Sequence, residues 1–313
     1  MENLNVYSSP HRASSRTTQS VMLHVIIALI PAIVAATIIF GLRALMLVLV
    51  TTACSVVWEA LCCIVMKKKT TIDDLSAVVT GILLALNLPV TLPFWMAAIG
   101  SFVSICVVKE LFGGLGKNFA NPAIVGRIVL MLSFTSAMTN WVQPFYYNDA
   151  DAVASATPLV TKSEDYLDLL LGNCGGTIGE VCALAILIGG IYLVAVKVIS
   201  PVTPLAFLGS VMIFSFLVGE DPVYQILSGG VMLGAVFMAT DYVTTPVTTL
   251  GKLIFGIGCG IITCVIRFYC SMAEGVSFAI LFMNIVTPFI DMATKSRPFG
   301  AKKAEKKAGG ADD

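Results

Sequence analysis

Charge is the first thing that this sequence lacks. Only 12% of its 313 residues are Asp, Glu, Lys or Arg, whereas 57% are hydrophobic. Soluble domains carry about 25% charged residues, so the composition excludes an ordinary soluble domain and indicates a membrane protein. The net charge is zero, which argues neither for nor against a nucleic-acid partner. From the apolar composition we expect membrane lipid around the chain, and no nucleic acid is expected as a partner.

Histidine and paired cysteine are also scarce. The chain has two histidines, His11 and His24, and its nine cysteines form no C-x-x-C pair. An iron–sulfur cluster needs several cysteines that converge, so we interpret the cysteines as packed helix residues and expect no metal site. The first 20 residues are polar and precede an apolar run long enough to span a bilayer, so we expect no cleaved signal peptide.

Long apolar runs dominate the rest of the chain. A bilayer core needs about 20 apolar residues per helix, and the runs predict an all-α polytopic membrane protein with about ten transmembrane helices. The third run is short and rich in small residues, which fits a broken or re-entrant element covered by protein. The predicted spans are residues 21–40, 44–66, 75–88, 94–112, 122–138, 177–198, 202–218, 224–240, 252–271 and 275–292.

The basic residues predict the orientation, because they collect in cytoplasmic loops. With the N-terminus in the cytoplasm, only Arg43, Lys162 and Arg267 of the 19 basic residues fall outside. We therefore predict a multi-pass protein of the cell (inner) membrane, with cytoplasmic termini and an extracytoplasmic 139–176 loop. The residues assigned to the cytoplasmic side are Arg12, Arg16, Lys67, Lys68, Lys69, Lys109, Lys117, Arg127, Lys197, Lys252, Lys295, Arg297, Lys302, Lys303, Lys306 and Lys307.

Five predicted spans precede the long polar gap and five follow it, which would invert the second half. Residues 73–89 weakly resemble residues 220–241, and the polar stretches 113–123 and 240–252 are paired as their counterparts. This similarity alone leaves an inverted repeat open. The predicted organisation is a cytoplasmic N-terminus (1–20), a first five-helix unit (21–138), an outer loop (139–176), a second five-helix unit (177–292) and a cytoplasmic tail (293–313).

The stretch GGLGKNFANPA combines glycines with Lys117, Asn118 and Asn121. Asn121 followed by Pro122 predicts a helix N-cap and first turn. A cap alone does not explain two amides and a cation among small residues. The combination indicates a planar ligand that is held by amides and packed on small side chains.

The stretch FMATDYVTTP places Asp241 beside Thr240 and Thr244 at the inner end of a predicted span. Ionisable residues in or next to a membrane are functional candidates. Two interpretations stay open: a solvated interfacial aspartate, or part of a path for an ion or a quinone-like ligand.

The polar gap contains DAVASATPL, in which small residues flank Thr157. A threonine before a proline is ordinary turn chemistry. The small side chains on one side of Thr157 also suit a residue that enters another enzyme's active site or lies under a bulky attached group. Nucleophilic catalysis is disfavoured, because neither histidine lies near Thr157 in the sequence.

These residues resemble a known family. DAVASATPL is similar to the flavinylation motif D-G-x-(S/T)-G-A-T, although Ala152 and Ser155 stand where glycine is common. FGGLGKNFANPAIVGR, GAVFMATDYVTTP and RFYCSMAEGVSFAILFMN resemble stretches of the D subunit of the Rnf electron-transport complex and of its relative, the B subunit of the Na⁺-translocating NADH:quinone reductase.

The resemblance implies two inverted five-helix repeats, similar to urea transporters, and two flavins. A flavin transferase would join FMN by a phosphoester to Thr157, within a motif that includes Asp151, Ser155 and Ala156. A second, non-covalent riboflavin would lie near the cytoplasmic side. The residues expected to hold this second flavin are Asn118, Asn121 and Lys117.

The resemblance also implies partners and a reaction. The complex would transfer electrons between ferredoxin and NAD, and this chain would pass electrons across the membrane between the covalent FMN and the second flavin. The other members would be the A, B, C, E and G subunits of Rnf, with the FMN-bearing G subunit on the outer side. The electron transfer would be coupled to Na⁺ or H⁺ movement. The phosphate of FMN keeps a charge and belongs outside hydrocarbon, which agrees with the predicted side of Thr157. The alternative is a channel or solute transporter of the same fold without flavin.

Overall fold

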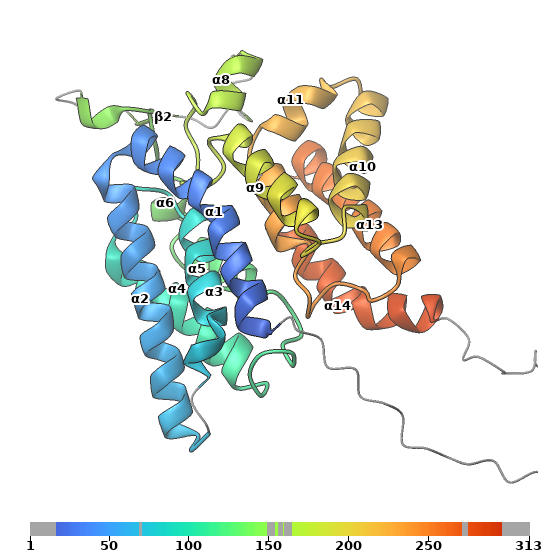
Figure 1. Ribbon diagram of the computed structural model, residues 1–313. Helices are drawn as coiled ribbons and strands as arrows, with labels where there is room; N and C mark the ends of the chain where they lie inside the picture. Colours follow the sequence, from blue (N-terminus) through green and yellow to red (C-terminus); the bar gives the residue numbers. More distant parts are fainter. Residues whose placement is uncertain are drawn as a thin grey trace, which may run out of the picture.

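The computed structural model is almost wholly helical (Figure 1). One short antiparallel pair joins β1 (Trp141–Val142) to β2 (Ala154–Ser155), with Trp141 opposite Ser155. This confirms the predicted helical class. The structure describes residues 17–68, 71–148, 154–155, 159, 165–270 and 275–295.

Within these residues, four helices are long and apolar enough to cross a membrane. Many large apolar side chains on them are exposed, as in Ile38 at 60% and Phe289 at 65%, which suits contact with lipid. Gly41, with φ of 74°, makes the sharp connection between the first two. The four helices are α1 (Thr18–Phe40), α2 (Leu42–Val65), α13 (Thr249–Tyr269) and α14 (Val276–Thr294).

The remaining apolar segments are shorter or interrupted. The predicted span 94–112 is helical but widens into a π-helix at Val103. These segments are η1 (Ile72–Asp74), α3 (Ser76–Leu86), α4 (Phe94–Phe102), the π-helix η2 (Val103–Glu110), α5 (Pro122–Ser133), α6 (Thr135–Met138), η3 (Tyr146–Asn148), α8 (Tyr166–Leu171), α9 (Ala183–Ala195), α10 (Val202–Val218), α11 (Pro222–Leu227), α12 (Val231–Leu233) and the π-helix η4 (Gly234–Met238).

Three spans predicted as continuous are broken. The 122–138 span divides at Phe134 into α5 and α6. The 224–240 span is interrupted after α11 by Gly229, whose φ is 64°.

The third broken span, 177–198, becomes helical only at α9. Its first residues pair with the chain after α3 instead: Ile178 N–H donates to the Leu88 carbonyl at 3.0 Å, and Gly179 N–H to the Leu86 carbonyl at 2.7 Å. Leu86 and Leu88 are fully buried. Such irregular backbone is tolerated at membrane depth because protein covers it.

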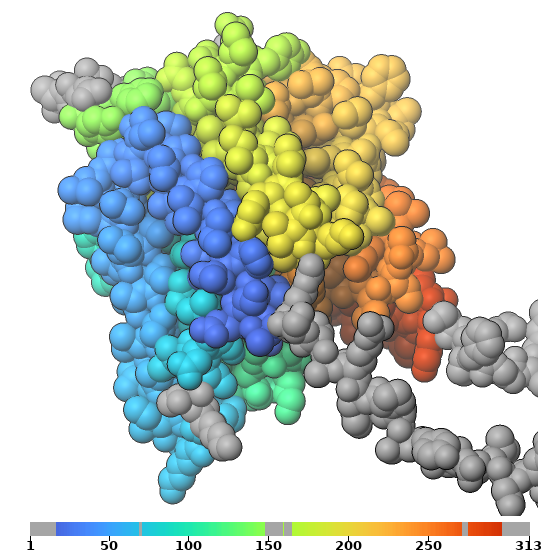
Figure 2. Space-filling model, viewed as in Figure 1, coloured from blue at the N-terminus to red at the C-terminus, as the bar shows by residue number. Residues whose placement is uncertain are grey.

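The two halves of the chain pack side by side, with α1–α5 on the left of Figure 1 and α9–α14 on the right. Helix α1 packs on α9, and α5 packs on α14. Figure 2 shows the blue surface of α1 against the yellow surface of α9. In Figure 1, α1 starts low and α14 ends low, whereas α8 and β2 lie at the top.

The element order corrects one pairing within the proposed repeat. Residues 113–123 lead into α5, the fifth long segment of the first half, whereas residues 240–252 lead into α13, the fourth of the second half. The two polar stretches are therefore not equivalent. The inverted relation between the halves stays a prediction.

Candidate functional site

The two polar stretches singled out in the sequence meet at one cavity. Asn118 and Asn121 from the first line it together with Thr240 and Asp241 from the second. The cavity is narrow, with a volume of about 70 Å³. Its other lining residues are Met22, Val25, Ser76, Val79, Thr80, Leu83, Lys109, Leu115, Pro122, Leu193, Ile199, Phe237 and Tyr242.

Asn118 and Asn121 differ in what their amides do. The Asn121 oxygen accepts from the Ala123 N–H at 3.0 Å, which confirms the predicted N-cap, and its nitrogen donates to the Met238 carbonyl at 3.3 Å. Asn118 is 8% exposed, and no described residue donates a hydrogen bond to its Oδ1. Asn121 therefore holds the fold, whereas Asn118 offers a buried acceptor at the cavity.

The loop before Asn118 contains three glycines with positive φ. Gly113, Gly114 and Gly116 have φ of 114°, 92° and 91°, a region that L side chains disfavour. Lys117 is exposed and does not line the cavity. The lysine that lines it is Lys109.

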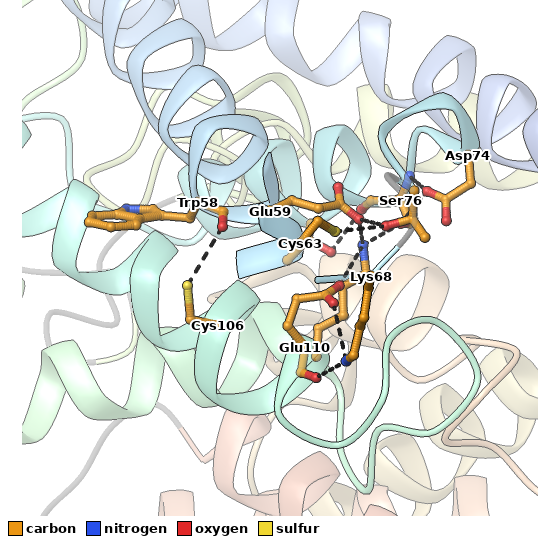
Figure 3. Close-up of polar contacts among 11 residues, drawn as sticks. Trp58, Glu59, Cys63, Lys68, Asp74, Ser76, Cys106 and Glu110 are labelled. Carbon is orange, nitrogen blue, oxygen red and sulfur yellow. Dashed lines mark hydrogen bonds and ion pairs between the residues drawn. The ribbon is translucent and has the colours of Figure 1, made fainter. Parts of the chain in front are cut away.

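Lys109 lies in a buried polar cluster that hydropathy and motifs did not reveal. Its Nζ is 2.5 Å from Glu59 Oε1 and 4.0 Å from Glu110 Oε1. These three side chains are at most 1% exposed. At the edge, the partly exposed Lys68 donates to the Glu110 carbonyl at 3.0 Å. Figure 3 shows Glu59, Lys68 and Glu110 converging.

Lys109 was predicted to lie on the cytoplasmic side, near the end of the 94–112 span, but its partners were not predicted. It is a buried ion-pair residue, because the π-helix η2 carries it against α2 and α3. π-Helical turns occur often at functional sites. The signal that could have located the cluster is Glu59, a lone carboxylate inside an apolar run.

Arg127, predicted within the 122–138 span, is a second buried charge. It is 2% exposed, and its Nη2 lies 3.3 Å from Glu180 Oε1. The guanidinium also donates to Asn87 at 3.1 Å and to Ser277 at 2.9 Å. These partners come from both halves of the chain, so Arg127 ties the halves together.

Asp241 lies between two cavities. The second cavity has a volume of about 480 Å³. It shares Thr240, Asp241 and Tyr242 with the first cavity, and Lys197 and Lys252 also line it. Thus Asp241 faces both cavities.

One threonine hydroxyl bonds to this carboxylate. Thr244, which is buried, donates to Asp241 Oδ2 at 3.1 Å, while Thr240 donates to the Val236 carbonyl at 2.6 Å. Burial raises the pKa of Asp241, and the Thr244 hydrogen bond opposes that shift.

The predicted flavin attachment motif lies largely outside the described residues. Asp151, Ala156 and Thr157 are among those not described, and Ser155 contributes its backbone to β2. Among the residues that the structure describes, no three His, Cys, Asp or Glu side chains converge as metal ligands.

The fold and the cavity define a helical membrane protein with a buried polar site where its two halves meet. The chain matches the NQR2, RnfD, RnfE family over residues 5–300 and belongs to that family. This confirms the resemblance found in the sequence.

Named relatives agree with this assignment. The chain is 47% identical to the D subunit of the Na⁺-translocating ferredoxin:NAD⁺ oxidoreductase complex of Acetobacterium woodii, with 98% of each chain covered. It is 39% identical to the D subunit of the proton-translocating ferredoxin:NAD⁺ oxidoreductase complex of Clostridium ljungdahlii, over 95% of this chain and 96% of that one. It is 35% identical to the D subunit of the ion-translocating oxidoreductase complex of Stutzerimonas stutzeri, over 90% and 91%.

Proposed function

We propose that this chain is the flavin-carrying membrane subunit of an ion-translocating ferredoxin:NAD⁺ oxidoreductase complex. The family membership and three relatives named as D subunits support this proposal. The chain would pass electrons across the membrane between a covalent FMN and a second flavin, and would work only together with the A, B, C, E and G subunits.

The transported ion would be Na⁺ or H⁺. Relatives at 47% and 39% identity are named for sodium and for protons respectively. The common side of the α1 start and the α14 end, opposite α8 and β2, supports cytoplasmic termini and an outer loop.

One observation carries the second flavin: the unsatisfied Oδ1 of Asn118 at a cavity with apolar walls. A flavin ring is planar and largely apolar, and its pyrimidine edge carries an N–H that can donate to such an acceptor. Phe237, Leu83 and Leu193 line the cavity and would pack on the ring. A bound flavin would supply one- and two-electron transfer, and the protein would supply position and electrostatics.

The covalent FMN would be attached to Thr157 by a flavin transferase. The proposal rests on the small residues of DAVASATPL and on the family. An FMN phosphoester keeps a negative charge, so it belongs in water or at the interface and not in hydrocarbon.

A substitution at Asn118 tests the second flavin. Asn118→Ala removes the acceptor, and leaving a buried N–H unpaired costs about 1–3 kcal/mol, or about 5- to 150-fold in affinity. The measurement is the amount of flavin that acid denaturation releases from the purified complex, relative to flavin that stays on the polypeptide.

The matched control is Lys117→Gln, which changes the exposed neighbour of Asn118 and should leave the released flavin unchanged. If Asn118→Ala retains as much dissociable flavin as the wild type across dilutions, the assignment of the cavity is wrong.

The alternative function is a channel or solute transporter. Its support is Asp241 and Thr240, which face two adjoining cavities and thus fit an ion path. It predicts ion or solute uptake into vesicles by the isolated chain and without flavin, whereas the proposed function predicts none.

A further inference from the structure

A chain of hydrogen bonds runs from Asp74 to the buried cluster described above. Ser76 donates through its hydroxyl to Asp74 Oδ1 and accepts from Lys109 Nζ at 2.6 Å. Lys109 in turn donates to Glu59 Oε1 at 2.5 Å. Figure 3 shows Asp74, Ser76 and Glu59 along this line.

The chain connects the protein surface with the cavity. Asp74 is half-buried and begins the line, whereas Ser76 is 4% and Lys109 is 1% exposed. Ser76 and Lys109 both line the cavity that contains Asn118. The inner end of the line therefore lies where a bound ligand would lie.

Each member of the line can hand on a proton. A hydroxyl donates and accepts at once, and a carboxyl and an ammonium each carry an exchangeable proton. Buried lysines change their protonation state more readily than arginines.

Other charged groups face Lys109. They are Glu59 from α2 and Glu110 from η2, with Lys68 beside Glu110. Glu59 Oε2 and Glu110 Oε1 are buried and accept no hydrogen bond from any described residue. The cluster thus has spare acceptors that can keep a positive charge near the cavity while protons move.

We propose that Asp74, Ser76 and Lys109 form a proton path that delivers a proton from solvent to a ligand reduced in the cavity. This inference rests on the proposed function, which supplies the flavin as acceptor and the electron from the redox chain of the complex.

In the resting structure the Ser76 hydroxyl donates to Asp74, so Asp74 first takes a proton from solvent. Lys109 Nζ gives a proton to the reduced ligand, the Ser76 hydroxyl turns and gives its proton to Nζ, and Ser76 takes the proton of the Asp74 carboxyl, which returns to the carboxylate. One solvent proton is consumed, and no residue is oxidised or reduced.

A purely structural cluster would behave differently. The Lys109–Glu59 ion pair would remain intact without the Ser76 hydroxyl, so its removal would leave proton transfer unchanged. If the proton path exists, removal of the Ser76 hydroxyl interrupts proton transfer, although it does not change the charge beside the cavity.

The test uses the full-length chain produced without a flavin transferase, so that only the dissociable flavin is reduced. Reduced methyl viologen, an electron donor that carries no proton, reduces the flavin in weak buffer; stopped-flow absorbance follows flavin reduction, and a pH-indicator dye follows proton uptake. Ser76→Ala and Asp74→Asn should each slow proton uptake by about 10²-fold, the lower end of what a positioned proton donor contributes. Their flavin content should match the wild type.

Two controls separate the path from structure. Ser76→Thr keeps the hydroxyl, and Asp73→Asn changes the exposed neighbouring carboxylate; both should take up protons at the wild-type rate. A small weak acid such as azide should accelerate uptake in Asp74→Asn and not in Ser76→Ala.

Each remaining outcome has a definite meaning. Wild-type uptake rates in both Ser76→Ala and Asp74→Asn, with flavin present, overturn the path and leave the proposed function standing. A wild-type chain without dissociable flavin removes the acceptor and overturns both.

Discussion

Glu180→Gln is a sharp test of how the two halves are held together. The change keeps the size of the side chain and removes its charge, which leaves Arg127 buried without its ion-pair partner at 3.3 Å. Breaking one side of a buried pair costs about 3–5 kcal/mol, because the remaining charge is uncompensated.

The assay is thermal unfolding of the detergent-purified chain. At about 2–4 °C per kcal/mol, the value for domains of 150–250 residues, a loss of about 3 kcal/mol lowers the apparent Tm by about 6–12 °C. Replacing both partners with apolar residues, as in Arg127→Met with Glu180→Leu, should recover much of this loss, since buried pairs are often neutral against hydrophobic replacements. If Glu180→Gln unfolds at the wild-type temperature, the pair does not hold the halves together.

Two further predictions concern packing and pH. A Cβ at Gly260 would lie 1.8 Å from Ser210 Oγ and 2.8 Å from the Phe207 carbonyl, so Gly260→Ala should destabilise the α10–α13 contact by about 1–3 kcal/mol in thermal unfolding. In Gly209→Ala, on the same helix α10, the added Cβ meets nothing within 4 Å, so the change should be neutral or up to about 1 kcal/mol stabilising; equal effects of the two substitutions would contradict the packing. The Tyr166 hydrogen bond holds the pKa of Asp221 below its usual 3.8, so this contribution to α8–α11 docking is present above that value and is lost as the pH falls below it. Hydrogen-exchange protection of α8 should therefore fall at low pH in the wild type, and a Tyr166→Phe variant with the same pH profile would refute the role of this bond.

The sequence predicted those features that depend on local chemistry. The long apolar runs located α1, α2, α13 and α14, and the Asn121–Pro122 pair located the start of α5. The break in the 177–198 span was missed because its backbone bonds to distant residues, as Gly179 does to Leu86. Hydropathy contains no information about such a partner.

In the candidate site, too, the residue types could be predicted from the sequence, whereas their contacts with distant residues could not. Asn118 and Asp241 were identified by residue type, but their meeting at one cavity depends on how the two halves pack. The ion pair between Lys109 and Glu59 was not predicted, because Glu59 lies 50 residues away in the chain. A charge near the end of an apolar run does not reveal its partner.

The central claim, that this chain is a flavin-carrying subunit, is tested most directly by the mass of the proteolytic peptide that contains Thr157. In the complex produced with its flavin transferase, we predict that this peptide carries the mass of FMN less one water, and that Thr157→Val abolishes the addition. A Thr157 peptide found only at its unmodified mass would contradict the account.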